Sequence, residues 1–323
     1  MQPERSGGRA CVVAVLKSLD ARRVAQIQAV DPRVRVVPVT DRTTWFEEAP
    51  DAEVILGFRP LREGATRARA LKWVHQGGAG VENLTEDVAG TEIVVTNTHV
   101  HGDTIAEHVL ALMLAHTRRL RELFQYQDRR EWGHDVLRAE RLLTGRTVGV
   151  LGLGTIGRAV ARRAAAFGMR VWGTRRHPAP VEGVERVLPP SGLDDVLRVS
   201  DVLAVTLPLT RETRGLIGAR ELGLLPRGAF LVNIGRGPII DEPALIDALR
   251  SGRLGGAGLD VFVQEPLPAT SPLWTVPNLI VSPHTSGGFP GYTDQMITLF
   301  CDNLRRYLTG QPLRNVVDTA LGY

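Results

Sequence analysis

The sequence predicts an α/β protein built from two doubly wound domains with parallel sheets. Short apolar runs of strand length alternate with segments of helical spacing along most of the 323 residues. This alternation is typical of parallel sheets that are covered on both faces. The chain is long for one hydrophobic core and has a suitable length for two domains. A glycine-rich turn near residue 152 joins a strand-like run to a helical segment, as expected in such a domain.

The first domain is predicted from an alternation of strands and helices up to about residue 103. The expected strands are Ala10–Leu16, Val34–Val39, Val54–Phe58, Leu71–His75 and Ile93–Thr96. Residues Ala21–Val30 have helical spacing between the first two of these strands. This part of the chain has no phosphate-binding glycine motif of its own.

A strongly apolar helix is expected to begin at Thr104 and to run to Phe124. Ile105, Val109 and Leu112 share one side of it, and further leucines widen this stripe. A helix this apolar is expected to be buried between domains or between subunits. Its place just before the second domain favours a crossing element.

The second domain is organised around Thr147–Gly157, which reads TVGVLGLGTIG. A strand over Thr147–Leu151, a glycine turn and a helix follow one another, which is the context that a dinucleotide-binding motif needs. Gly152 permits the tight turn, Gly154 lets a pyrophosphate approach the backbone, and Gly157 lets the helix pack close to the strand. The free N–H groups and the positive dipole end of the helix are then available to phosphates.

The end of the next strand predicts which dinucleotide is preferred. An acidic residue at this place binds the ribose 2′-hydroxyl of NAD, but the strand ends in Thr174, Arg175 and Arg176. Arginine suits a phosphate through its planar donor fork. We therefore expect NADP to be preferred over NAD, with NAD as the alternative if the two arginines are only solvated surface residues.

The rest of the chain continues the alternation. The expected strands are Met169–Gly173, Val202–Thr206, Ala229–Ile234, Gly256–Val261 and Leu279–Ser282, and the expected helices are Leu193–Val199, Glu221–Leu225 and Pro243–Leu249. A last helix over residues 294–308 is far from the glycine turn and could return to the first domain. The predicted boundaries are thus 1–103 with 288–323 for a discontinuous first domain, and 104–287 for the second.

Composition excludes several classes of protein. No apolar run approaches the roughly 18–20 residues of a membrane span. The net charge is only +4 despite a pI near 9.5, and the basic residues are scattered, which argues against nucleic-acid binding. Cys11 and Cys301 lie in apolar surroundings without metal-like spacing. They are expected to be buried free thiols in a reducing compartment, which places the protein in the cytoplasm.

Three polar residues follow strands of the second domain at the ends where open α/β sheets bind ligands. Hydride transfer between a 2-hydroxy acid and a nicotinamide needs an acid–base group, and His284 suits this task. Arg236 offers a bidentate fork to the substrate carboxylate. Glu265 beside the histidine would orient the ring and favour its charged form. These three are the predicted catalytic residues, whereas His101 and His108 are weaker candidates that we expect to be structural.

Seven stretches of the chain resemble the D-isomer-specific 2-hydroxyacid dehydrogenase family. They are GGAGVEN at 77–83, TIAEHVLALMLA at 104–115, TVGVLGLGTIG at 147–157, TLPLTRETRGLI at 206–217, LVNIGRGPIID at 231–241, GAGLDVFVQEPLP at 256–268 and VSPHTSGG at 281–288. Together they cover most of the chain and are highly specific. The resemblance implies a Rossmann nucleotide-binding domain inserted in a flavodoxin-like substrate domain, with the active site in the cleft between them.

The resemblance also implies roles for residues of this chain. Arg236 would bind the substrate, Glu265 would support His284 as the acid–base, and the backbone of Gly78, Ala79 and Gly80 would bind the substrate carboxylate. Asp260 would meet the nicotinamide carboxamide. The implied cofactor-binding residues are Gly152, Gly154, Thr155, Ile156, Gly157, Thr174, Arg175, Arg176, Leu207, Pro208, Thr213, Ile234, Gly235, Arg236, Asp260, His284 and Gly287. No metal is expected. The resemblance also implies a homodimer that forms through the helix Thr104–Leu120.

The function that this pattern favours is an NADP-preferring reductase of small 2-keto acids such as glyoxylate or hydroxypyruvate. One alternative is D-3-phosphoglycerate oxidation with NAD. Gln76 stands where an arginine would help with a phosphorylated acid, although Arg59 could serve there, and the sequence ends at 323 without the regulatory extension of longer phosphoglycerate dehydrogenases. The other alternative is a non-catalytic corepressor-like protein that senses a dinucleotide, since such proteins share this fold.

Overall fold

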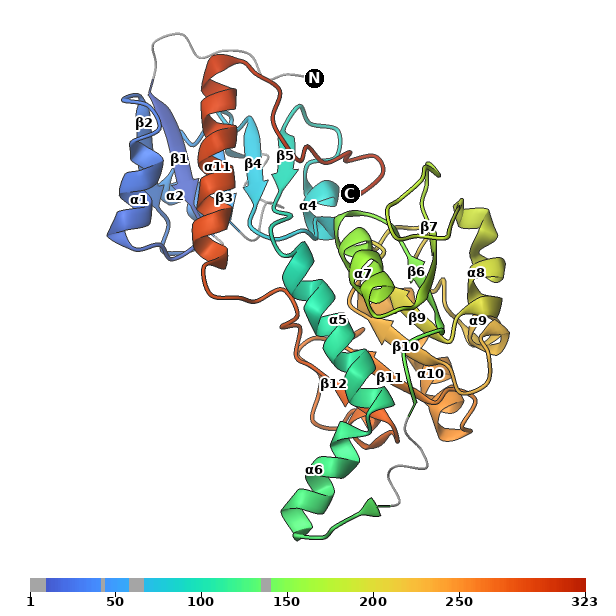
Figure 1. The fold of residues 1–323 in the computed structure, drawn as a ribbon. Coiled ribbons are helices and arrows are strands. Elements are labelled where there is room, and N and C mark those ends of the chain that lie inside the picture. The colour runs from blue at the N-terminus through green and yellow to red at the C-terminus, as the bar shows by residue number, and fades with distance from the viewer. Residues whose placement is uncertain (1–9, 42–43, 58–66, 135–140) are drawn as a thin grey trace. The chain divides into compact units, whose positions relative to one another are not determined.

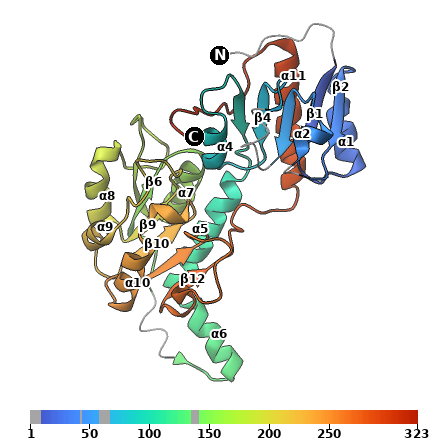
Figure 2. The same ribbon diagram turned by 180° about the vertical axis from the view of Figure 1, so that it is seen from behind.

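The computed structural model describes residues 10–41, 44–57, 67–134 and 141–323. It divides into two compact units, Met1–Val100 with Pro290–Tyr323, and His101–Phe289. Each unit contains a parallel sheet with helices on its faces (Figures 1 and 2). The predicted fold class is confirmed, and the boundaries expected after residue 103 and before residue 288 stay a prediction.

The first unit has a five-stranded sheet in the order β2-β1-β3-β4-β5, the strand order of the flavodoxin-like fold. Its strands are β1 (Cys11–Val15), β2 (Val34–Pro38), β3 (Val54–Gly57), β4 (Trp73–Gln76) and β5 (Val94–Asn97). Its helices are α1 (Ala21–Gln28), α2 (Trp45–Glu48), α4 (Glu82–Asp87) and α11 (Tyr292–Thr309). The predicted third strand extended to Phe58, which lies outside the described residues.

Side chains of β1 alternate between two apolar layers, so this central strand is buried on both faces. Val13 contacts the layer that contains Ile27 of α1 and Phe300 of α11. Ala14 contacts the layer that contains Trp45 of α2 and Leu84 of α4. The last helix of the chain therefore packs on the sheet formed by the first hundred residues.

The second unit has a seven-stranded sheet in the order β12-β11-β10-β9-β6-β7-β8. Six of these strands follow the dinucleotide-binding order, and β12 extends the sheet at one edge. The strands are β6 (Thr147–Leu151), β7 (Arg170–Thr174), β8 (Arg186–Leu188), β9 (Val202–Val205), β10 (Phe230–Asn233), β11 (Gly256–Leu259) and β12 (Leu279–Val281). The helices are α5 (Gly102–Thr117), α6 (Leu120–Arg129), α7 (Thr155–Ala166), α8 (Leu193–Val199), α9 (Ala219–Leu224) and α10 (Glu242–Arg250). Short 3-10 turns occur at Pro190–Gly192, Gly237–Ile239 and Pro272–Thr275.

Two apolar layers cover this sheet as well. Helices α5 and α7 contribute Val109 and Val160 to one layer, and α8, α9 and α10 supply Leu197, Leu222 and Leu245 to the other. Both faces of the sheet are thus covered by apolar side chains. Ligands are therefore expected to bind at the ends of its strands. Within the described residues, no helix combines the length and the apolar character that a membrane span requires.

The long helix predicted over 104–124 is wrong as one element. The structure has α5 from Gly102 to Thr117, and a second helix, α6, begins at Leu120. Arg119 between them adopts the left-handed conformation with φ of 56°, which turns the chain. The apolar spacing continues across this turn without a glycine or proline, so no local signal indicates the break. In the structure α5 packs against the sheet and α7 of its own unit.

Candidate active site

Six neighbouring strands of the second unit end at one level of the sheet. Backbone register aligns their last residues in the row Thr174, Leu151, Val205, Asn233, Leu259 and Val281. Because neighbouring strands lie only about 4.8 Å apart, the loops that follow this row lie side by side. Every catalytic and cofactor-binding residue predicted for this unit belongs to the row, to one of these loops or to the first turn of α7.

His284 and Glu265 are brought together at this edge from two different loops. His284 Nδ1 lies 2.7 Å from Glu265 Oε2. The other carboxylate oxygen of Glu265 accepts from the N–H of Phe262 at 2.9 Å, which fixes its orientation. The His284 side chain is 48% exposed, and its second ring nitrogen, Nε2, is the one not occupied by Glu265. This pair has the arrangement of an acid–base histidine with an orienting carboxylate.

His284 also has an unusual backbone. Its φ of 53° is in the left-handed region, which is uncommon for a residue other than glycine. Its N–H donates to the carbonyl oxygen of Ser282 at 3.1 Å. Such a conformation costs roughly 1–3 kcal/mol and persists only where the surroundings enforce it.

Asp260 fixes the conformation of the loop that carries His284. It has no exposed surface, and its Oδ1 accepts from the hydroxyl of Ser282 at 2.7 Å and from the N–H of Thr285 at 2.9 Å. Its Oδ2 accepts from the N–H of Ser286 at 3.0 Å. Three donors on both sides of His284 therefore converge on one buried carboxylate. The predicted contact of Asp260 with the nicotinamide stays a prediction, and in this structure its oxygens serve the loop.

Arg236 lies on the loop after β10, next to the loop that carries Glu265. A Cβ on Gly237 would lie 1.9 Å from the carbonyl carbon of Phe262, so only glycine permits this close approach of the two loops. Asn233 fixes the turn, because its side chain donates to the Arg236 carbonyl at 3.0 Å and accepts from Gly235 N–H at 3.0 Å. The half-buried guanidinium of Arg236 donates to the Gly235 carbonyl at 2.7 Å.

Gly152 and Gly157 have the geometry that the sequence predicted, whereas the approach of a pyrophosphate to Gly154 stays a prediction. Gly152 has a φ of 96°. A Cβ on Gly157 would lie 2.1 Å from the Gly152 carbonyl oxygen, so helix and turn pack too closely for a side chain. A Cβ on Gly154 would meet nothing within 4 Å. This open space lies at the start of α7, where Thr155 and Ile156 begin the helix without a side-chain cap.

The two arginines after β7 differ in their surroundings. Thr174 is buried, and its hydroxyl accepts from Gly152 N–H at 3.3 Å, which ties β7 to the glycine turn. Arg176 donates to Glu212 at 2.6 Å. The guanidinium of Arg175 has no such ion pair among the described residues. The structure thus gives the two guanidiniums different surroundings, while their contact with a cofactor stays a prediction.

The remaining predicted cofactor-binding residues lie on the same row of loops. The hydroxyl of Thr213 donates to the Pro208 carbonyl at 2.7 Å, which closes the loop after β9. A Cβ on Gly235 would lie 2.7 Å from the carbonyl oxygen of Leu207, so the loops after β9 and β10 touch there. Ile234 is buried. Gly287 lies beside the ring of His101, at ordinary contact distance.

In the first unit, Gly78, Ala79 and Gly80 follow β4 in a loop whose carbonyl groups all point to partners. The hydroxyl of Tyr292 donates to the Gly77 carbonyl, and Thr98 N–H donates to that of Gly78 at 3.1 Å. Side-chain amides of Asn97 and Gln76 donate to the Ala79 and Gly80 carbonyls at 2.7 and 3.2 Å.

The N–H groups of Gly78, Ala79 and Gly80 differ from the carbonyl groups of this loop in their hydrogen bonding. Within the described part of the chain none of them has an acceptor, and all three residues are partly exposed. Successive free N–H groups make a concave site that attracts anions. The loop thus has the properties that a carboxylate-binding site needs, whereas Arg59, an alternative for a phosphorylated acid, lies outside the described residues.

Several residues hold the site through contacts that were not predicted from sequence. Asn97 and Tyr292 fix the glycine loop, Asn233 fixes Arg236, and His108 contacts Ser282 at 3.0 Å. Asn233, His108 and Ser282 fall within motifs already recognised, so their motif context was the available signal. Tyr292 has no local signal, because its partner Gly77 is 215 positions away.

One buried histidine is structural. The hydroxyl of Thr98 donates its proton to the Gln76 carbonyl, so Thr98 Oγ1 accepts from His75 Nε2 at 3.1 Å. In a neutral imidazole the other nitrogen is an acceptor, so His75 Nδ1 accepts from the hydroxyl of Thr96 at 2.7 Å, and the Thr96 oxygen also accepts the indole N–H of Trp73. Burial lowers the pKa of His75 to about 3. The ring is therefore neutral and fully bonded.

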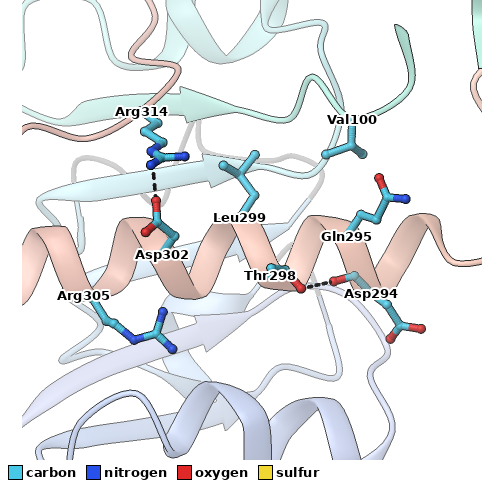
Figure 3. A pocket seen from close by; sticks show the side chains of 8 residues that line it. All are labelled: Val100, Asp294, Gln295, Thr298, Leu299, Asp302, Arg305 and Arg314. Atoms are coloured by element: carbon cyan, nitrogen blue, oxygen red, sulfur yellow. Dashed lines mark hydrogen bonds and ion pairs between the residues drawn. The ribbon is translucent and has the colours of Figure 1, made fainter. Parts of the chain in front are cut away.

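A cavity of about 620 Å³ lies elsewhere, along α11 in the first unit (Figure 3). It is lined by Gln295 and Asp302 of this helix and by Arg314 of the following segment. Asp302 forms ion pairs with Arg306 and Arg314 at 3.0 and 3.1 Å, so its charge is already balanced. None of the residues predicted for the site lines this cavity.

Comparison with known proteins gives one family. Residues 110–286 match the model of the NAD-binding domain of D-isomer specific 2-hydroxyacid dehydrogenases. Glyoxylate/hydroxypyruvate reductase B of Pectobacterium atrosepticum is 43% identical over 281 residues, which cover 83% of this chain and 86% of that protein.

Two further similarities differ in extent. D-3-phosphoglycerate dehydrogenase of Methanocaldococcus jannaschii is 33% identical over 88% of this chain, but the chain spans only 55% of that protein. A crystal structure of NADPH-dependent glyoxylate/hydroxypyruvate reductase from Sinorhizobium meliloti, in complex with NADP and sulfate, is 29% identical. It has a TM-score of 0.85 and covers 98% of this chain and 100% of its own.

Proposed function

This chain belongs to the D-isomer specific 2-hydroxyacid dehydrogenase family of NAD(P)-dependent enzymes, and we propose that it reduces a small 2-keto acid with NADPH. Glyoxylate and hydroxypyruvate are the proposed substrates. The observation that carries this proposal is the pair of His284 and Glu265, 2.7 Å apart at the ligand-binding edge of a dinucleotide-binding sheet.

The residues present fit a nicotinamide dinucleotide. The open space at Gly154 and the uncapped start of α7 suit a pyrophosphate. Arg175, at the end of β7, would hold a 2′-phosphate through its planar fork. When bound, the nicotinamide supplies a hydride to C2 of the keto acid. The other predicted cofactor contacts would position the ring at the loops after β9 to β12.

The protein's own residues then have separate tasks. Arg236 and the free N–H groups of the Gly78–Gly80 loop would bind the substrate carboxylate. With Nδ1 directed at Glu265, His284 would give a proton from Nε2 to the carbonyl oxygen at C2. Arg236 would stabilise the negative charge that develops on this oxygen before the proton arrives. The reverse reaction would use the same groups, with His284 as the base.

Two observations favour a small acid over a phosphorylated one. The relative with higher identity and more complete coverage is named a glyoxylate/hydroxypyruvate reductase, and Gln76 of this chain is uncharged. Oxidation of D-3-phosphoglycerate with NAD is the second candidate, supported by the similarity to a D-3-phosphoglycerate dehydrogenase. A corepressor-like sensor would need no acid–base pair, so the presence of His284 with Glu265 argues against it.

We place this activity in the cytoplasm. Cys11 and Cys301 are both free and buried. Burial raises the pKa of Cys11 to about 12 and that of Cys301 to about 11, so neither thiol ionises readily. Two unreactive free thiols suit a reducing compartment.

The test is the oxidation of NADPH and NADH, in parallel, against glyoxylate, hydroxypyruvate, pyruvate and phosphohydroxypyruvate. We expect rapid turnover of glyoxylate or hydroxypyruvate with NADPH. The variant His284→Ala should lose roughly 100- to 10,000-fold in kcat and still bind NADPH in a fluorescence titration. Preference for phosphohydroxypyruvate with NADH would support the second candidate. Tight dinucleotide binding without turnover of any of these acids would contradict the proposal.

A further inference from the structure

We propose that His108, on helix α5, is a positioning residue for the loop that carries His284. This inference rests on the proposed role of His284 as the acid–base group. His108 lies 176 positions before His284 in sequence, and its link to the reaction is an uninterrupted chain of hydrogen bonds through Ser282 and Asp260.

The first link is the contact between His108 and Ser282. His108 Nε2 lies 3.0 Å from Ser282 Oγ and 3.9 Å from Asp260 Oδ1. The His108 side chain is 25% exposed, so it reaches this buried carboxylate from the surface of the unit.

The proton positions along this chain follow from the chemistry of the groups. A carboxylate can only accept, so the hydroxyl of Ser282 donates its one proton to Asp260, at 2.7 Å. The oxygen of Ser282 must then accept from His108, which therefore carries a proton on Nε2. The direction His108 to Ser282 to Asp260 is thus fixed, and each donor strengthens the next bond.

The last link is the hydrogen bonding of Asp260 to the loop that carries His284. Its two oxygens accept from the N–H groups of Thr285 and Ser286, directly after His284. Ser282 precedes His284 by two residues and holds its N–H through its carbonyl. Hydrogen bonds on both sides of His284 therefore hold its backbone in the left-handed conformation. His108 adds the last hydrogen bond to this network, through Ser282.

Helix α5 is a suitable support for this anchor. It packs against the sheet and α7 through a layer of buried residues that includes Ala106, Val109 and Met113. His116, two turns further along α5, differs from His108 in its environment. Its ring stacks on Phe230 at 4.2 Å, and burial lowers its pKa to about 4. His116 thus serves packing, whereas His108 has polar partners that lead to the catalytic loop.

The experiment compares four test variants and one control variant with the wild type. His108→Phe keeps a ring but removes the donor, and His108→Gln restores an N–H donor near the position of Nε2. Ser282→Ala removes the bridge, and the double variant His108→Phe with Ser282→Ala tests whether both act through one path. Glu107→Gln, on the exposed neighbouring position of α5, is the matched control.

The first readout is hydrogen exchange in the substrate-free protein, which does not depend on activity. We expect the amides of Thr285 and Ser286 to exchange about tenfold faster in His108→Phe, the effect of losing one typical hydrogen bond. Protection should return in His108→Gln and be unchanged in Glu107→Gln. Ser282→Ala should act like His108→Phe, and the double variant should add little.

The second readout is steady-state kinetics with the best keto acid. We expect kcat to fall roughly tenfold in His108→Phe, less than the roughly 100-fold that a 1 Å misplacement of a reacting group costs. KM for the keto acid should stay near the wild-type value, and His108→Gln should recover most of kcat. Unchanged exchange in His108→Phe, or additive losses in the double variant, would overturn the proposal. A wild type without turnover would instead contradict the proposed function, while the exchange result would still decide the role of His108.

Discussion

Arg175 and Arg176 are neighbours in sequence, yet the structure gives them different capacities to bind an anion. Arg176 is paired with Glu212, whose side chain is 74% exposed. An exposed pair of this kind stabilises by only about 0–1 kcal/mol, but it directs the guanidinium toward the loop after β9. Arg175 has no ion pair among the described residues, and it follows directly after buried Thr174. The proposed preference for NADPH therefore depends mainly on Arg175.

Replacing Arg175 by alanine should change the cofactor preference. A hydrogen bond to a charged group contributes about 1.5–3 kcal/mol. We therefore expect kcat/KM for NADPH to fall roughly 10- to 150-fold and kcat/KM for NADH to stay within about twofold. Arg176→Ala is the control, and its loss for NADPH should be clearly smaller because Glu212 already occupies the side chain. Equal losses for NADPH and NADH in Arg175→Ala would contradict this assignment.

At the scale of elements, the site depends on loops that touch through glycine. The loop after β10 carries Arg236 and the loop after β11 carries Glu265. The two meet where Gly237 lies against the backbone of Phe262. The side chain of Glu242 adds a second tie, since it accepts from Val263 N–H at 2.7 Å. The backbones that carry Arg236 and Glu265 are thus held together by the Gly237 contact and by the Glu242 hydrogen bond.

The variant Gly237→Ala should separate these two loops. Its Cβ would lie 1.9 Å from a backbone carbon, which cannot move away as a flexible side chain could. We expect the free energy of unfolding to fall by about 1–3 kcal/mol and kcat to fall at least about tenfold. Gly223→Ala is the matched control, because a Cβ there meets nothing within 4 Å and the residue lies in α9. That variant should be neutral or more stable by up to about 1 kcal/mol, with normal kcat. Wild-type activity in Gly237→Ala would refute the idea.

Most elements could be predicted from sequence because each strand and helix carries its own local signal. Thr147–Leu151 and Leu193–Val199 were predicted with the bounds that the structure shows. The edge strand Arg186–Leu188 was missed because three half-exposed residues leave no run of apolar side chains. The break at Arg119 was missed because nothing in the local sequence forces a left-handed residue there.

The residues of the candidate site also divide into those that could be predicted from sequence and those that could not. His284, Glu265 and Arg236 could be found because they follow strands and fall in recognisable motifs, and the structure places the first two in contact. The partners that hold them could not be found from spacing. Tyr292 and Gly77, or His108 and Ser282, become neighbours only when the sheets form, since 215 and 174 positions separate them. Sequence patterns report local periodicity, whereas these contacts depend on tertiary packing.

At the scale of the whole molecule, the described residues of the second unit leave helix α6 without a buried side chain. This helix extends away from the sheet (Figure 1). Leu123 and Phe124 of α6 are 40% and 60% exposed, and Trp132, which follows the helix, is 89% exposed. Gly133 lies against the ring of Tyr126, so the segment that carries Trp132 folds back beside α6. These residues form an apolar surface that we name the α6 surface.

We propose that a second copy of this chain covers the α6 surface. The dimer expected from sequence through residues Thr104–Leu120 stays a prediction, and α6 begins where this stretch ends, at Leu120. Exposed aromatic and aliphatic side chains on a helix without a buried face favour association. Sedimentation equilibrium should therefore give about twice the chain mass of 35.2 kDa.

The double variant Phe124→Glu with Trp132→Glu should dissociate this dimer, because a like pair of charges would be buried without partners on both copies. We expect the monomer mass, with near-native circular dichroism, since both side chains are exposed and make little contact within the unit. Leu321→Glu, an exposed apolar residue of the first unit, is the control and should stay dimeric. If the wild type sediments as a monomer, or if the double variant remains a dimer, the α6 surface does not join two copies. A monomeric variant with full turnover would further show that each chain carries a complete site.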